Sequence, residues 1–327
     1  MTDQTSLLQR VKGALLKAAV TALGLPCRTY LPYVLLGAWN RTVGGWFSVF
    51  YCYAGSRAFI GTYAPKLFVE AFRWFPVPIG VLRHEGKLGL VIASPVLESE
   101  FLDPANAAAF RRLQERVRRV ARIVGAERIS LTGILPSVIA DDGILNLPDT
   151  RPIVQRAVCG AVRRVMRESF PGGPVPILLL GGAGHIGVPI AGALREHGFA
   201  VHVIDPRAGQ SRFPDNLRGR PCLVLDCSRP GVLESYLDQM WPGMVHLNEV
   251  FPRTPRRVIE PLTAQGIPCW HLSGLAGSIF PPLPHGYEGA VPCCAAHGAS
   301  DEPEVVLVRL NPEIDVAADG ATAAQAA

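Results

Sequence analysis

Four apolar residues, Ile177 to Leu180, lead directly into a glycine cluster, and this junction constrains the fold more than any other feature. Gly182, Gly184 and Gly187 follow the G-x-G-x-x-G spacing. In that spacing the first glycine makes a tight turn, the second lets the backbone approach a pyrophosphate, and the third lets a helix pack on the strand. The junction therefore predicts a buried strand, a phosphate-binding turn and a helix whose N-terminus faces the phosphates.

The segment 171–194 carries no Lys, Arg, Asp or Glu and is long enough to span a bilayer. It combines a short apolar strand, the glycine cluster and Pro189, and a soluble fold accounts for all three. In the first turn of a helix, Pro189 removes an N–H that has no intrahelical partner. We therefore interpret the segment as strand, turn and helix.

Strand and helix signals alternate steadily after Pro174, which is typical of a parallel sheet with crossover helices. We expect strands at 176–180, 200–205, 222–227, 244–247 and 268–272. Helices are expected at 186–197, 232–239 and 255–265. The predicted fold class is α/β, with a doubly wound parallel-sheet Rossmann domain preceded by a smaller α/β domain.

The second predicted strand ends at Asp205, about 20 residues beyond the glycines, where such domains carry an acid. Its carboxylate would accept hydrogen bonds from the adenosine ribose of NADH. Arg207 and Arg212 follow closely, and either would hold the 2′-phosphate of NADPH. The predicted cofactor is therefore NADPH or NADH.

We expect four regions along the chain: an apolar and aromatic segment at 1–83 that would face a membrane or a substrate, a smaller α/β domain for the substrate at 84–173, the dinucleotide domain at 174–311, and a disordered tail at 312–327. In the second region, strands are expected at 88–93 and 128–131, and helices at 106–124 and 152–169. The first region begins with a basic amphipathic helix at 7–23. Such a helix either lies on an anionic membrane or packs on its own protein, and both interpretations stay open.

The overall composition excludes several classes of protein. Hydrophobic residues make up 49% and charged residues 18%, so a substantial core is expected. A net charge of +5 without a long basic run argues against nucleic-acid binding. Eight cysteines lack a paired C-x-x-C metal spacing, which predicts no metal and reduced thiols in a cytoplasmic protein, with peripheral membrane contact as an addition.

Ligands of doubly wound sheets bind beyond the carboxyl ends of the strands. Three predicted strands end in Asp226-Cys227-Ser228, His246-Leu247-Asn248-Glu249 and Ser273-Gly274. The expected cofactor-binding residues are Gly182, Ala183, Gly184, His185, Ile186, Gly187, Asp205, Arg207, Cys227, Ser228, Ser273 and Gly274. Downstream, Cys293, Cys294 and His297 form a reactive string, in which the imidazole would lower the pKa of a thiol. These three are the candidate catalytic residues, although adjacent cysteines are also common as buried apolar residues.

The layout from about 86 to 296 resembles the NADPH-dependent, aldehyde-forming acyl-(acyl carrier protein) reductases. The similarity lies in order and spacing, and it rests on Gly89-Leu90-Val91, Leu97-Glu98-Ser99, Leu131-Thr132-Gly133, Pro136-Ser137-Val138-Ile139, Gly266-Ile267, Leu272-Ser273-Gly274-Leu275 and Cys293-Cys294-Ala295-Ala296. The chain departs from the family at Ala296, where the family has a glutamate. It also has Asp205-Pro206-Arg207 where the family has an arginine after its second strand.

The resemblance implies reduction of an acyl thioester, or of a related apolar carbonyl compound, through an acyl group bound to Cys293, or to Cys294 if the register shifts by one. It also implies an acidic acyl carrier protein as a partner, which the basic helix face from Arg111 to Arg122 would suit. Two alternatives stay open. One is a direct hydride-transfer dehydrogenase of the shikimate or amino-acid type, with His246, His271 or Asp226 as acid or base. The other is a non-catalytic, membrane-associated dinucleotide-binding protein.

Overall fold

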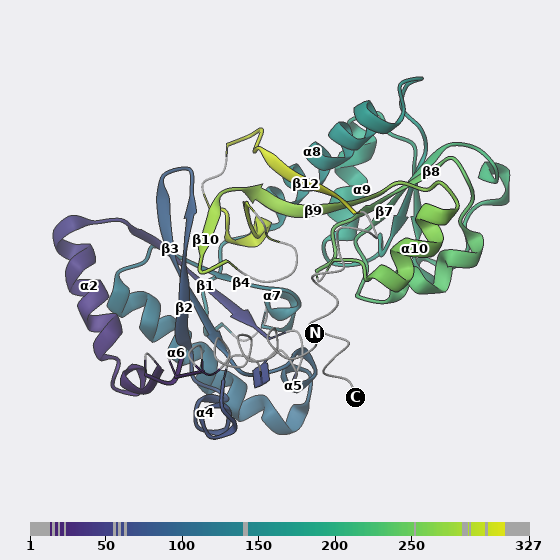
Figure 1. Ribbon diagram of the computed structural model, residues 1–327. Coiled ribbons are helices and arrows are strands. Elements are labelled where there is room, and N and C mark those ends of the chain that lie inside the picture. Colours follow the sequence, from purple (N-terminus) through teal and green to yellow (C-terminus); the bar gives the residue numbers. More distant parts are fainter. Residues whose placement is uncertain are drawn as a thin grey trace, which may run out of the picture. The chain divides into compact units, whose positions relative to one another are not determined.

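The computed structural model describes residues 14, 17–18, 20–22, 24–54, 57, 60–61, 64–139, 143–251, 253–282, 287, 289–297 and 300–310 (Figure 1). Most of the expected helix 7–23 and all of the expected tail 312–327 lie outside these residues. The chain divides into two compact units. Unit 1 comprises Met1–Pro148 with Ile279–Pro281, and unit 2 comprises Asp149–Ser278 with Pro282–Ala327.

Unit 1 is built on a five-stranded sheet in the order β10-β2-β3-β1-β4. Strand β1 runs parallel to both β3 and β4, whereas β2 is antiparallel to β3. The strands are β1 (Trp46–Tyr53), β2 (Val77–His84), β3 (Lys87–Ser94), β4 (Arg128–Leu131) and β10 (Ser278–Phe280). The helices are η1 (Leu25–Thr29), α2 (Leu31–Val43), α4 (Lys66–Phe72), α5 (Glu98–Phe101), η2 (Pro104–Asn106), α6 (Ala107–Val124) and α7 (Leu135–Val138).

The aromatic run at 46–53, in the region that was expected to face a membrane or a substrate, is β1, an interior strand of this sheet between β3 and β4. Phe50 and Tyr51 of β1 are each only 1% exposed, so both faces of the sheet are covered at this strand. Tyr51 shares one apolar core with Leu113 and Val117 of α6. The strong amphipathic pattern of α6 is explained by this core, into which its apolar face packs.

Unit 2 contains a seven-stranded, mostly parallel sheet in the order β11-β9-β8-β7-β5-β6, and β12 also pairs with β9. Strands β5 to β9 form the parallel part, whereas β11 and β12 are antiparallel to β9. The strands are β5 (Ile177–Leu180), β6 (Val201–Ile204), β7 (Cys222–Asp226), β8 (Met244–Asn248), β9 (Cys269–Ala276), β11 (Ala290–Val291) and β12 (Val305–Leu310). All five strands predicted for this part of the chain are therefore present.

Helices cover both faces of the unit 2 sheet (Figure 1). Helices α8 and α9 contact the strands on one face. On the other, Leu178 of β5 and Val224 of β7 share a core with Val258 and Leu262 of α10. The helices are α8 (Arg151–Ser169), α9 (Gly187–Glu196), α10 (Arg256–Ala264), η3 (Pro206–Ala208), η4 (Asp215–Leu217), η5 (Val232–Gln239) and η6 (Cys293–Ala295).

The division into units differs from the expected boundaries at 83/84 and 173/174. Residues on both sides of 83/84 belong to one sheet, because β1 pairs with β3. The Pro-Gly-rich segment before Pro174 is a turn within unit 2, since α8 precedes it and packs against α9, β8 and β9. The segment 171–194 divides into β5 and α9 as predicted. Within the described part of the chain, no helix is both long and apolar enough to cross a membrane.

Candidate functional site

The glycine turn joins β5 to α9 and is held by close backbone packing. Gly181 has a φ of +76°, and a Cβ on it would lie 2.7 Å from the Cα of Ser228. A Cβ on Gly187 would lie 2.2 Å from the carbonyl oxygen of Gly181 and 2.7 Å from the Cα of Gly182. The third glycine of the motif therefore has the predicted role, because it lets α9 approach the strand. The left-handed residue of the turn is Gly181, which the motif spacing did not identify.

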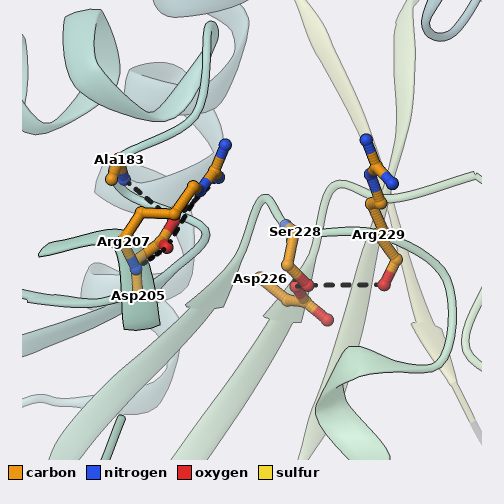
Figure 2. Close-up of polar contacts among 6 residues, drawn as sticks. All are labelled: Ala183, Asp205, Arg207, Asp226, Ser228 and Arg229. Carbon is orange, nitrogen blue, oxygen red and sulfur yellow. Dashed lines mark hydrogen bonds and ion pairs between the residues drawn. The ribbon is translucent and has the colours of Figure 1, made fainter. Parts of the chain in front are cut away.

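Asp205, at the end of β6, fixes both the glycine turn and an arginine (Figure 2). Its side chain is 4% exposed and accepts hydrogen bonds from the backbone N–H of Ala183 at 3.2 Å and of Arg207 at 2.9 Å. The guanidinium of Arg207 adds bonds from Nε to Oδ1 at 3.1 Å and from Nη2 to Oδ2 at 2.9 Å. These bonds, those from the Arg207 guanidinium above all, hold the pKa of the Asp205 carboxyl below its ordinary value.

Four N–H groups thus occupy the carboxylate of Asp205, which has about four acceptor positions. The sequence predicted that this carboxylate would be open to a ribose. Instead, it holds the side chain of Arg207, which is 69% exposed, close to the glycine turn. Arg207 Nη2 lies 3.5 Å from the position that a Cβ on Gly184 would take. A positive group therefore stands at the end of β6, beside the turn.

A second carboxyl group, that of Asp226, ends β7 (Figure 2). It is 4% exposed and accepts hydrogen bonds from both the backbone N–H and the hydroxyl of Ser228. Burial raises the pKa of Asp226, and these two bonds only partly oppose the effect. Its backbone carbonyl accepts from the N–H of Glu249 at 2.9 Å, so the end of β8 is fastened to the end of β7.

Glu249 directly follows β8 and interacts electrostatically with Asp226 and with three cysteines. Burial, and then the negative charge of Asp226, raise the pKa of Glu249 to about 8. Its own charge in turn raises the pKa of three thiols, those of Cys227, Cys293 and Cys294. At neutral pH the Glu249 carboxyl is therefore mostly protonated, and it can donate a proton. The strand-end string His246-Leu247-Asn248-Glu249 included this residue, yet the expected site did not.

Cys293 and Cys294 come close enough to interact with Glu249, because they follow β11, which pairs with β9. Gly274 of β9 has a φ of +133°, and a Cβ on it would lie 2.1 Å from the carbonyl oxygen of Val291. Gly274 was expected to border a cofactor, but its small size is used for the approach of β11. Strand β11 is followed within two residues by η6, which contains both cysteines.

The two candidate nucleophiles are poorly ionised in this environment. Burial raises the pKa of Cys294 to about 12, and it raises the pKa of Cys293 well above its ordinary value, with smaller contributions from Glu249 and Cys294. The predicted effect of His297 was the opposite, namely to lower the pKa of a thiol. His297 is itself buried, and its backbone N–H donates to the carbonyl oxygen of Ala295.

The described residues contain no group of His, Cys, Asp and Glu side chains suited to a metal ion.

The two histidines proposed as an acid or base lie within the sheet. His246 is fully buried in β8, and burial lowers its pKa to about 4. His271 of β9 is 1% exposed, and its Nδ1 lies 3.0 Å from Nδ2 of Asn248. Because that amide also donates to the carbonyl of Val250, the geometry fits His271 Nδ1 as an acceptor. Both imidazoles are therefore enclosed within the sheet.

Most of the predicted cofactor residues meet at one edge of the unit 2 sheet. The turn 182–187 follows β5, Asp205 and Arg207 follow β6, and Cys227 and Ser228 follow β7. The imidazole of His185 is exposed in this turn. Ser273 and Gly274 are the exceptions, because both lie within β9. Ser273 is 1% exposed, and its hydroxyl has no hydrogen-bond partner in the structure.

Two features of unit 1 bear on the resemblance. Tyr53, at the end of β1, donates a hydrogen bond to Glu98 at 2.7 Å. Gly133 lies next to that tyrosine, since a Cβ there would be 2.2 Å from Tyr53 Oη. Leu97-Glu98-Ser99 and Leu131-Thr132-Gly133, two of the strings on which the resemblance rests, therefore come together at the carboxyl ends of β1 and β4.

The basic face of α6 remains a predicted docking site for an acidic protein. The exposed arginines of this face are Arg111, Arg112, Arg118, Arg119 and Arg122. Arg116 is partly buried, donates to the carbonyl of Trp74 and stacks on Phe75.

Comparison with known proteins adds no family assignment. No protein-family model matches the chain, and no curated protein sequence matches it either.

Proposed function

We propose that unit 2 is a doubly wound, Rossmann-type domain that binds a nicotinamide dinucleotide, and that the protein is an oxidoreductase. The packing of Gly187 against Gly181 and Gly182 carries the proposal, because it sets the end of α9 directly beyond β5. The strand order supports it. Strand β5 lies between β6 and β7. The chain therefore passes from β5 to a strand on one side and then crosses to a strand on its other side. Ligands of such sheets bind at this switch point.

The arrangement around Asp205 favours NADPH over NADH. An acid that binds the ribose of NADH needs free acceptor positions, and those of Asp205 are taken by Ala183 and Arg207. The ion pair instead holds the Arg207 guanidinium beside the turn, where a 2′-phosphate would be bound. The residues therefore fit a dinucleotide that carries a 2′-phosphate, as NADPH does.

Glu249 is the proposed proton donor. When bound, the dinucleotide would supply a hydride for a carbonyl carbon of the substrate. The substrate's carbonyl oxygen then needs a proton, and the Glu249 carboxyl holds one at neutral pH because its pKa is raised to about 8. Carbonyl, hydride and proton together give an alcohol, so the reaction balances without a further reactant.

This geometry favours direct reduction of an apolar carbonyl compound over the covalent route implied by the resemblance. A covalent route needs a thiolate, and burial disfavours ionisation of Cys293 and Cys294. The reductase activity can be tested by following NADPH oxidation with aldehydes, ketones and acyl thioesters. We expect Glu249→Gln to abolish turnover while dinucleotide binding persists.

The matched comparison is the double variant Cys293→Ala with Cys294→Ala, which we expect to keep its turnover. Loss of turnover in the double variant, with Glu249→Gln still active, would restore the covalent route. No oxidation with any carbonyl compound, despite tight dinucleotide binding, would favour the non-catalytic alternative.

The cofactor preference has its own test in Arg207→Ala, with Arg212→Ala as the matched control. Charge-assisted hydrogen bonds contribute about 1.5–3 kcal/mol, so Arg207→Ala should weaken NADPH binding by about 10- to 150-fold. Binding of NADH should change little. Loss of NADPH affinity in the control alone would assign the phosphate to Arg212, and an unchanged preference in both would contradict the NADPH assignment.

A further inference from the structure

Helix α2 is fixed to unit 1 along one face. A Cβ on Gly37 would lie 1.9 Å from the carbonyl oxygen of Ile123, so the α2 backbone rests directly on α6. Tyr33, on the same face, is fully buried and donates to the carbonyl of Pro76 at 2.8 Å. Asn40 donates to the carbonyl of Val124 at 3.0 Å. The rotation of α2 about its axis is therefore determined.

The opposite face of α2 is apolar and exposed. Leu31, Leu35, Trp39 and Val43 recur at four-residue intervals and are 54%, 63%, 59% and 65% exposed, and Val34 beside them is 44% exposed. We call these five residues the α2 face. A helix packed on its own protein normally presents polar residues to water, and a contiguous apolar surface of this kind marks an interaction site.

The stretch of sequence that contains α2 carries charge of one sign. From Gln4 to Val69 the sequence holds seven Lys or Arg residues and no Asp or Glu. Arg41 is exposed on α2 itself. The guanidinium of Arg119, on α6, lies 4.4 Å from the ring centroid of Tyr30, directly before the helix. Positive side chains are therefore present on α2 and beside its first residue, which favours an anionic partner.

We propose that the α2 face docks on an anionic lipid surface. Leucine, valine and tryptophan side chains enter the interfacial region of a bilayer, where tryptophan is enriched, while arginines contact the lipid phosphates. A second copy of the chain fits less well, since it would bring the same positive charges together. At 13 residues α2 is too short to span a bilayer, so it lies along the surface. The proposal does not depend on the dinucleotide site.

Sedimentation with vesicles tests this proposal on the full-length protein. The vesicles contain phosphatidylcholine alone or mixed with phosphatidylglycerol. We expect binding to the anionic vesicles only, weakened by salt. The double variant Leu35→Glu with Trp39→Glu should bind at least about tenfold more weakly. The control is Leu102→Glu, which places one glutamate at a 52% exposed leucine of unit 1 outside α2, and it should bind like the wild type.

Several results would overturn the proposal. Unchanged vesicle binding in the double variant would assign the contact to another segment, and an equal loss in Leu102→Glu would show a non-specific charge effect. A dimer that the double variant dissociates, measured by light scattering, would identify a second copy as the occupant. A lower unfolding temperature in the double variant alone would mean that the protein covers this face itself.

Discussion

Gly187→Ala and Gly192→Ala place the same methyl group in α9 and should change its stability in opposite directions. At Gly187 the new Cβ would lie 2.2 Å from the carbonyl oxygen of Gly181 and 2.7 Å from the Cα of Gly182. Both contacts are with backbone atoms, and Cβ atoms essentially never approach closer than 3.0 Å. The N-terminus of α9 must therefore move away from the strand. At Gly192, in the middle of the helix, a Cβ would meet no atom within 4 Å apart from the helix's own backbone and the neighbouring residues.

The expected magnitudes follow from these contacts. Inserting a methyl group into a tightly packed position costs about 1–3 kcal/mol. Replacing glycine by alanine in an open helix position stabilises by about 0.5–1 kcal/mol, because the unfolded chain loses less entropy on folding. The free energies of opening of α9 should therefore differ between the two variants by about 1.5–4 kcal/mol, the sum of these effects.

Hydrogen exchange followed by mass spectrometry measures this difference locally, in peptides that cover α9. Protection should fall in Gly187→Ala and rise slightly in Gly192→Ala. NADPH binding should weaken only in Gly187→Ala. Equal protection in the two variants would refute the close packing of α9 on the glycine turn, and with it the main support for the dinucleotide site.

Three further predictions concern the carboxyl edge of the unit 2 sheet. Because folding raises the pKa of Glu249 from 4.5 to about 8, the stability that its protonated form contributes is lost as the pH rises between these values. Glu249→Gln should flatten this decline in urea unfolding, and an unchanged slope would contradict the raised pKa. Cys293 and Cys294 should react with iodoacetamide at neutral pH at least about tenfold more slowly than free cysteine, because burial raises their pKa; mass spectrometry that finds rapid labelling of either thiol would restore it as a candidate nucleophile. Gly274→Ala should lower the unfolding free energy by about 1–3 kcal/mol, because its φ of +133° strains an alanine and the Val291 carbonyl leaves no room for a Cβ; wild-type stability in urea would refute this.

Much of unit 2 could be predicted from its sequence because its local signals agree with its tertiary structure. The strand at 177–180 is apolar at every position, as expected for a strand covered on both faces, and a glycine turn and an amphipathic helix follow it. The same agreement holds for α6 in unit 1, whose apolar residues recur at helical spacing. The sequence pattern was sufficient to predict a helix or strand wherever the apolar residues that form the pattern are the ones that are buried.

The remaining features depend on contacts that are distant in sequence. The aromatic strand β1 has no alternating pattern, because β3 and β4 flank it and residues on both of its faces are buried. Strand β9 continues to Ala276, beyond the predicted end at 272, because Gly274 accommodates β11. Glu249 belongs to no sequence motif. Its raised pKa depends on burial and on Asp226, which is fastened to it by a backbone hydrogen bond between two strand ends.

The state of Asp205 also could not be read from spacing. The motif places an acid after β6, but only the structure shows that its acceptors are filled by Ala183 and Arg207. An arginine two residues after an acid occurs in many turns, so the pair in the sequence does not reveal a salt bridge. The geometry reverses the expected contribution of this acid, from a ribose acceptor to a support for Arg207.

Fluorescence titration of the intact wild-type protein with NADPH and with NADH tests the central claim most directly. The account predicts saturable binding of one dinucleotide per chain, with NADPH bound more tightly than NADH. Tighter binding of NADH would contradict the role given to Arg207 and leave the dinucleotide site in place. Failure of both dinucleotides to bind would contradict the account as a whole.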